Sequence, residues 1–214
     1  MAPMTVHEMT DEEYLIAVRK AREESVHFFA SDKRAEREMW VANEFLSNLG
    51  IQFEQSEIVH VTDDPPDVRF RGAEFEIKEI LDEGRRRHAD YKASLERANA
   101  ATSPSELLEH YTPRDITYTE VCALVEARCM ELAAKYSPDA RSQMDLLFYI
   151  DLEDVHGYVK TPLPSPDQWS PLGFRSVSLV MGRLSGVLMA RTSAPDFLKD
   201  GVPRIVRRPT RRDE

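Results

Sequence analysis

The sequence has few features of secreted or membrane proteins. Only two of its 214 residues are cysteines, Cys122 and Cys129, and they lie seven residues apart in a segment with helical spacing. Two thiols without nearby histidines do not form a zinc site, and so few cysteines are typical of a reducing compartment. No apolar run approaches the roughly 20 residues of a membrane span. The N-terminus lacks the charged segment and apolar core of a signal peptide. We therefore expect a cytoplasmic protein that does not associate with membranes.

Positive charge is also scarce. The chain has 28 Lys and Arg against 38 Asp and Glu, a formal net charge of −10. This argues against a general nucleic-acid coat protein, which is usually basic, but not against an enzyme that contacts DNA through a local patch. Two segments are basic, "GRRRH" at residues 84–88 and "PRIVRRPTRR" at 203–212. Each segment can be explained equally well without nucleic acid, the first as a solvated helix start and the second as a flexible tail. A Gly-rich phosphate loop and a Gly-x-Ser-x-Gly motif are both absent.

Capping motifs and hydrophobic periodicity predict a single α/β domain. The signatures "TDEE" (10–13), "SPSE" (103–106) and "TYTE" (117–120) mark helix starts, and Gly50 ends a second helix. Strands are predicted at 51–60, on both sides of Gly72, at 144–151 and on both sides of Gly182. We expect residues 1–201 to form one domain, with a mixed β-sheet flanked by helices, an N-terminal helical lead-in and a C-terminal β-hairpin. Residues 202–214 are expected to form a flexible basic tail.

The stretch "DPPDVRFRGAEFEIKEI" at residues 64–80 has an unusual charge pattern. Side chains alternate along a strand, so Phe75 and Ile77 face one way and Glu76 and Lys78 the other. If the two strands pair through Gly72, the carboxylate of Asp67 approaches that of Glu76. Two carboxylates beside an ammonium suit Mg²⁺, which keeps several waters. Such a site can polarise a phosphoryl oxygen and activate water.

A solvated strand face is the simpler explanation, because exposed charge pairs contribute only about 0.2–1 kcal/mol. Against it, six acids crowd into 17 residues of this region, and their repulsion disfavours folding unless a cation relieves it. Those acids are Asp63, Asp64, Asp67, Glu74, Glu76 and Glu79.

The motifs "PD" at 66–67 and "EIK" at 76–78 resemble the signature of the PD-(D/E)xK nuclease superfamily. The segment "AEREMWVANEFLSNLGIQF" at 35–53 is similar to the opening helix of archaeal Holliday-junction resolvases. The whole chain also resembles a family of uncharacterised bacterial proteins labelled as endonucleases. The resemblance implies a restriction-endonuclease-like core over about residues 32–98. The helices after residue 103, the proline-rich loop and the late hairpin have no counterpart in the compact resolvases.

The resemblance also implies roles for individual residues. Glu36 would be a helix-borne acid that reaches the metal through water, although Glu38 and Glu44 compete for this role. Asp67, Glu76 and the backbone carbonyl of Ile77 would be direct metal ligands, and Lys78 the catalytic lysine.

Basic and aromatic residues follow the predicted catalytic strand. Arg85, Arg86 and Arg87 come seven to nine residues after Lys78 and are candidates for phosphate contacts, although Asp82 and Glu83 could simply neutralise them. Tyr91 and Lys92, one turn later, are further candidates for substrate contacts. The sequence thus predicts a Mg²⁺- or Mn²⁺-dependent endonuclease-like phosphodiesterase that acts on DNA. Cleavage of both strands would favour a two-fold dimer. The alternative is a catalytically silent nucleic-acid- or protein-binding module on the same fold.

Overall fold

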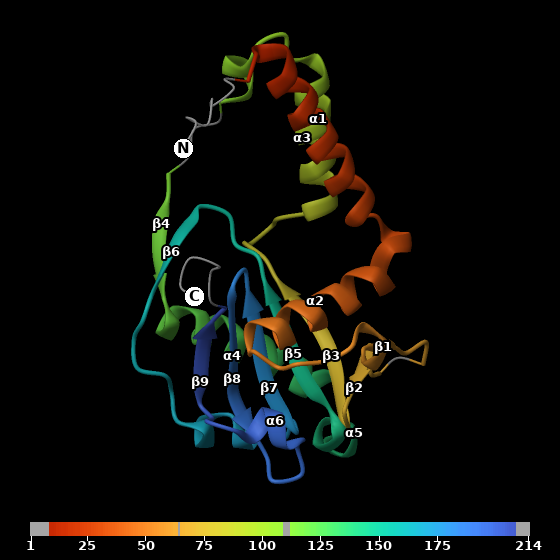
Figure 1. Ribbon diagram of the computed structural model, residues 1–214. Helices are drawn as coiled ribbons and strands as arrows, with labels where there is room; N and C mark the ends of the chain where they lie inside the picture. Colours follow the sequence, from red (N-terminus) through yellow and green to blue (C-terminus); the bar gives the residue numbers. More distant parts are fainter. Residues whose placement is uncertain (1–8, 64, 109–111, 209–214) are drawn as a thin grey trace, which may run out of the picture. The chain divides into compact units, whose positions relative to one another are not determined.

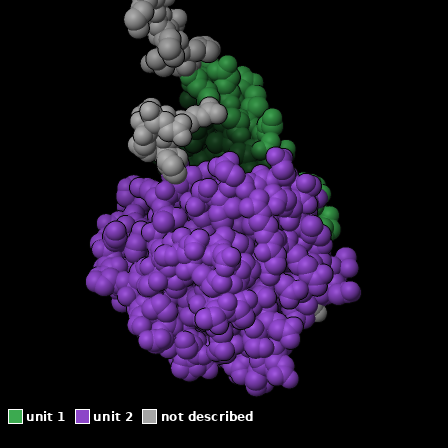
Figure 2. Space-filling model, turned by 60° about the horizontal axis from the view of Figure 1, so that its bottom comes forward, with its two compact units in different colours: residues 1–34, 84–112 green, residues 35–83, 113–214 purple. Residues whose placement is uncertain are grey.

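The computed structural model of the protein describes residues 9–63, 65–108 and 112–208 (Figure 1). The chain forms two compact units, which Figure 2 distinguishes by colour. A helical unit comprises residues 1–34 and 84–112, and a sheet unit comprises residues 35–83 and 113–214. The expected domain of residues 1–201 includes parts of both units. Among the described residues, no helix combines the length and apolar character needed to cross a membrane.

The helical unit is built on α1 (Asp11–Phe28) and α3 (Arg87–Ala100), followed by a 3₁₀ turn at Pro104–Leu107. α1 begins at the predicted capping box, in which Thr10 and Glu13 satisfy each other's backbone N–H groups. Arg19 of α1 donates hydrogen bonds to the carbonyl oxygens of Ala98 and Ala101, at 3.0 and 2.8 Å. These bonds join the two helices, because the last carbonyls of a helix have no partner within it.

The sheet unit contains a seven-stranded mixed sheet in the order β1-β2-β3-β5-β7-β8-β9. Strands β3, β5 and β7 run parallel, and the other neighbours pair antiparallel. This is the expected mixed sheet flanked by helices, with β7 and β8 as the C-terminal hairpin. The strands are β1 (Val59–His60), β2 (Val68–Phe70), β3 (Ala73–Ile80), β5 (Asp145–Ile150), β7 (Ser176–Met181), β8 (Leu184–Ala190) and β9 (Arg204–Arg207).

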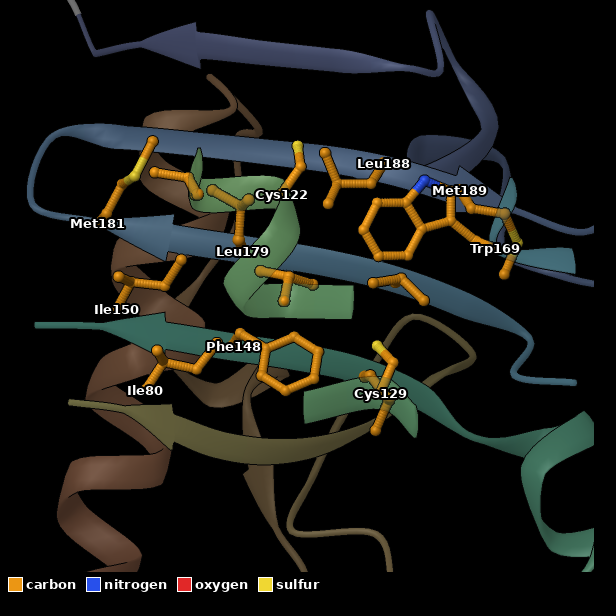
Figure 3. Packing of buried hydrophobic residues seen from close by; sticks show 14 of the residues in the cluster. Ile80, Cys122, Cys129, Phe148, Ile150, Trp169, Leu179, Met181, Leu188 and Met189 are labelled. Atoms are coloured by element: carbon orange, nitrogen blue, oxygen red, sulfur yellow. The ribbon is translucent and has the colours of Figure 1, made fainter. Parts of the chain in front are cut away.

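The two faces of the sheet are covered by different helices (Figure 1). On one face, α2 (Arg34–Asn48) packs its apolar side against Phe75 and Ile77 of β3. On the other face, α4 (Tyr118–Lys135) packs against Ile80 and the alternate residues of β5 and β7 (Figure 3). Because the side chains of a strand alternate between faces, Glu76 and Lys78 lie on the face that α4 covers.

The two cysteines lie in the core on the α4 face (Figure 3). Both thiols are reduced. Burial raises the pKa of the Cys122 thiol to about 11 and that of Cys129 further still. Because the thiolate is the reactive form, this burial disfavours both cysteines as nucleophiles at neutral pH.

Several predicted elements differ from the structure. Of the strand expected at 51–60, only Val59–His60 form a strand, because Gln55–Glu57 form a 3₁₀ turn. The predicted flexible tail is wrong for Arg204–Arg207, which form β9 and pair with β8; residues 209–214 lie outside the described part. The parallel pair β4 (Arg114–Thr117) and β6 (Val155–Val159) was not predicted, nor were the short helices α5 (Pro138–Gln143) and α6 (Asp196–Lys199).

Candidate active site

The hairpin of β2 and β3 determines which side chains meet. Its register pairs Val68 with Phe75 and Arg69 with Glu74, and the turn between the strands has positive φ at Arg71 (42°) and Gly72 (80°). Glycine suits the second position because it has no Cβ to clash. One further step along this register places Asp67 opposite Glu76. The N–H of Asp67 still donates to the carbonyl of Phe75 at 2.9 Å, so the ladder reaches this residue.

Asp67, Glu76 and Lys78 form one charged cluster, as strand alternation and hairpin pairing through Gly72 together predicted. Lys78 Nζ lies 2.5 Å from Glu76 Oε1 and 3.7 Å from Asp67 Oδ2. Glu76 is fully buried and Asp67 is 2% exposed, whereas the side chain of Lys78 is 19% exposed. Two carboxylates with this little exposure are costly unless they are paired, and Lys78 supplies a shared counter-charge.

The two oxygens of Glu76 have different surroundings. Oε1 accepts a 2.8 Å hydrogen bond from the hydroxyl of Tyr136 and also faces the ammonium of Lys78. Oε2 is buried and has no hydrogen-bond partner in the described part of the chain. A buried carboxylate oxygen without a partner is rare, and a bound water or ion is among its few explanations. Sequence spacing gave no signal for Tyr136, which is 60 residues from Glu76.

These residues fit a hard divalent cation. Mg²⁺ needs only one or two protein carboxylates and completes its shell with water, so Asp67 and Glu76 suffice. Glu76 Oε2 is the oxygen with unused acceptor capacity. In the described part of the chain, no three His, Cys, Asp or Glu side chains gather in a group that could hold a metal. A cation at this cluster would therefore need water for most of its coordination shell.

Ile77 links the two acids through its backbone. Its N–H donates to Asp67 Oδ2 at 2.8 Å, while its side chain packs among the residues of α2. The N–H and C=O of one strand residue point to the same edge of the strand. The carbonyl of Ile77 therefore points to the edge on which Asp67 lies, where the resemblance expects a metal ligand.

The helix-borne acid is placed differently from the expectation. Glu36 is exposed in the first turn of α2, and α2 packs on the sheet face opposite Glu76 and Lys78. The buried acid of this helix is Glu38, 8% exposed, whose Oε2 lies 3.2 Å from His60 Nε2. His60 belongs to β1, next to Val61, whose N–H donates to the carbonyl of Asp67 at 2.9 Å. The sequence gave no reason to prefer Glu38 over Glu36.

The basic segment after β3 belongs to the helical unit. Arg87 is only 5% exposed, and its guanidinium lies 4.6 Å from the ring centre of Phe29. Tyr91 stacks on the same ring at 5.0 Å. Arg87 therefore packs in the interior rather than at the exposed position that a phosphate contact needs. Arg85 Nε lies 3.7 Å from Asp90 Oδ2. Arg86 and Lys92 are the exposed members of the predicted nucleic-acid-binding set.

A further buried acid lies on the neighbouring strand. Asp145, at the start of β5, receives hydrogen bonds from Arg175 Nε (3.1 Å) and from the Ser176 hydroxyl (2.7 Å). Its other oxygen receives the N–H of Glu74 at 2.9 Å and a second bond from Arg175. Sequence reasoning missed this group, because its members are separated by 71 and about 30 positions in the chain.

Comparisons with known proteins give a family and a structural relative. No curated protein matches the chain. A solved structure of a protein of unknown function from Pseudomonas aeruginosa strain PAO1, described as belonging to a monooxygenase superfamily, is similar with 26% identity and a TM-score of 0.63. The alignment covers 93% of this chain and 96% of that protein. A family model matches residues 10–211, and the chain therefore belongs to the family described as "Putative endonuclease, protein of unknown function".

Proposed function

We propose that this protein is a Mg²⁺- or Mn²⁺-dependent endonuclease of the PD-(D/E)xK type that hydrolyses phosphodiester bonds in DNA. The observation that supports the proposal most directly is the cluster of two buried carboxylates around one partly exposed lysine. Glu76 Oε2 in that cluster is buried without a hydrogen-bond partner in the described residues. The family description names the same class of activity, and the motif order Asp67, Glu76, Lys78 follows the nuclease signature.

Each residue has a distinct role in the proposal. Asp67, Glu76 and the carbonyl of Ile77 hold the cation, and the cation supplies Lewis-acid polarisation of the phosphoryl oxygen and acidification of water. Lys78 lies between the acids and its side chain reaches solvent, so it can orient the attacking water. Its ammonium also stabilises the negative charge that grows on the phosphoryl group.

The exposed Arg86 and Lys92 are the remaining candidates for phosphate contacts outside the cluster. Such contacts position the nucleic acid without selecting a sequence. Cleavage of both strands of a duplex would favour two symmetry-related sites, so a two-fold dimer is part of the proposal. Light scattering on the purified protein, with and without DNA, tests the dimer.

The deciding experiment is a cleavage assay on plasmid, linear and branched DNA with Mg²⁺ or Mn²⁺. Wild-type protein, Lys78→Ala and Lys160→Ala are compared, because Lys160 is an exposed lysine outside the cluster. We expect cleavage by the wild type and by Lys160→Ala, and none by Lys78→Ala.

The alternative function is a catalytically silent nucleic-acid- or protein-binding module. The observation in its favour is that Lys78 already pairs with both acids, so the cluster can persist without a metal as a network of ion pairs. Calorimetric titration with Mg²⁺ and Mn²⁺ separates the two functions. Absence of both cleavage and metal binding in the wild type would support the silent module and overturn the nuclease proposal.

A further inference from the structure

Tyr136 occupies a position that the chain fixes by local rules. It follows the last residue of α4, and its N–H still donates to the carbonyl of Leu132 at 3.0 Å. The following residues, Ser137 and Pro138, start α5. A proline two residues on prevents α4 from continuing, so Tyr136 has extended dihedrals, φ −98° and ψ 144°. The stop of α4 thus determines where the phenol lies.

The side chain of Tyr136 contacts the charged cluster directly. Its hydroxyl donates to Glu76 Oε1 at 2.8 Å, the oxygen that also faces Lys78 Nζ at 2.5 Å. The ammonium of Lys135 lies 5.4 Å from the centre of the Tyr136 ring, a cation–π distance. Two donors on one oxygen fix the rotation of the carboxylate. They also leave the second oxygen, Oε2, without a partner in the described residues.

We propose that Tyr136 is a positioning residue that holds Glu76 Oε1 and thereby presents Oε2 to a divalent cation. The inference rests on the proposed metal site, but it concerns metal affinity rather than cleavage. Groups that orient a metal ligand through a hydrogen bond contribute strongly to affinity, and their loss weakens binding about 10- to 100-fold. Lys78 alone cannot replace the phenol, because a lysine side chain has four flexible bonds and one hydrogen bond leaves the carboxylate free to turn.

The test is calorimetric titration of the full-length protein with MnCl₂, without DNA, for the wild type and two variants. Tyr136→Phe removes only the hydroxyl. Tyr158→Phe is the matched control. Tyr158 is half-buried against the same core, and its hydroxyl makes no hydrogen bond within the described part of the chain. We expect Mn²⁺ to bind Tyr136→Phe about 10-fold or more weakly than the wild type, and Tyr158→Phe to match the wild type.

A thermal melt in EDTA separates positioning from general stability. A purely structural tyrosine would lower the melting temperature of the metal-free protein and leave the Mn²⁺ affinity of the folded protein unchanged. That result, or tighter binding by Tyr136→Phe, would overturn the inference while the nuclease proposal stands. If the wild type binds Mn²⁺ and Tyr136→Phe binds it weakly, but neither protein cleaves DNA, the inference stands and the nuclease proposal fails. Absence of Mn²⁺ binding by the wild type overturns both.

Discussion

Two buried carboxylates on neighbouring strands, Glu76 of β3 and Asp145 of β5, differ in how fully they are satisfied. Both are fully buried. Asp145 accepts four hydrogen bonds, two on each oxygen, from Arg175, Ser176 and the backbone of Glu74. Glu76 Oε1 meets Tyr136 and Lys78, whereas Oε2 has no partner in the described chain.

The difference indicates different roles. A buried charge whose acceptor positions are all used stabilises the fold. Asp145 connects the start of β5 to the β2–β3 hairpin, and Arg175 also donates to the carbonyl of Gly72 in the hairpin turn at 3.2 Å. A buried charge with an unused oxygen costs stability, and such costs gather at sites that bind ligands. The comparison therefore favours a structural role for Asp145 and supports the metal site proposed at Glu76, although both clusters consist of acids and bases.

The largest expected effect is on cleavage. Asp67→Ala, Glu76→Ala or Lys78→Ala should lower the cleavage rate about 1,000-fold or more, because each removes a cation ligand or the group that stabilises growing charge. Ser176→Ala, which removes one donor to Asp145, should cleave like the wild type. Cleavage rates on plasmid DNA, with circular dichroism to confirm folding, measure the contrast. Similar rates for Lys78→Ala and the wild type would contradict the proposed mechanism.

The next effect is on stability. Asp145→Ala should lower the free energy of unfolding by about 3–5 kcal/mol, because it leaves the largely buried Arg175 without its counter-charge. Arg69→Ala is the control, since Arg69 pairs with Glu74 at the surface, 3.2 Å away, and surface pairs contribute about 0–1 kcal/mol. Urea denaturation measures both. A decrease of less than about 1 kcal/mol in the free energy of unfolding of Asp145→Ala would show that this cluster does not stabilise the fold.

Metal binding should stabilise the wild type through Glu76. Mn²⁺ at 100 times its dissociation constant adds about 2.7 kcal/mol to the free energy of unfolding, if only the folded protein binds it. Glu76→Gln should lose this gain, because it removes the charge of the proposed ligand. Glu74→Gln changes the acid two positions earlier on the same strand face and should keep the gain. Melting curves with and without Mn²⁺ measure it, and an equal gain in Glu76→Gln would remove Glu76 from the metal site.

The smallest effect concerns an exposed pair, Arg71 and Glu57. The pKa of Glu57 is lowered from 4.5 to about 2, first by the hydrogen bonds of the Arg71 side chain and then by the backbone of Glu54. Because the folded pKa is the lower one, the contribution to stability is complete above pH 4.5 and is lost as the pH falls towards 2. Arg71→Ala should return the Glu57 pKa towards 4.5, which carbon-detected NMR titration measures. An unchanged pKa would show that Arg71 is not the main cause.

The local parts of the candidate site could be predicted from the sequence. Period-2 alternation placed Glu76 and Lys78 on one face, and the turn at Gly72 brought Asp67 opposite Glu76. Both depend on contacts between residues close in the chain, which obey simple rules. The segment at 51–60 was mispredicted because its alternating apolar residues mimic a strand, whereas a capping box of Glu54 and Glu57 closes a 3₁₀ turn there.

The packing of the basic segment could not be predicted. Arg87 and Tyr91 were expected to face a substrate, but both stack on Phe29, which precedes them by more than 50 residues. The apolar stem of an arginine and its flat guanidinium can cover an aromatic ring as readily as they bind phosphate. Composition alone does not distinguish these two uses.

Patterns in the sequence were enough to predict the mixed sheet, the central hairpin and the cluster of Asp67, Glu76 and Lys78. The structure was needed to show that Glu38 rather than Glu36 is the buried acid of α2, and that Tyr136 donates a hydrogen bond to Glu76. It also placed Arg204–Arg207 in the sheet as β9. The physical reason is that alternation and turns depend on neighbours in the chain. The partner of a buried charge, in contrast, is set by how distant helices and strands pack against each other.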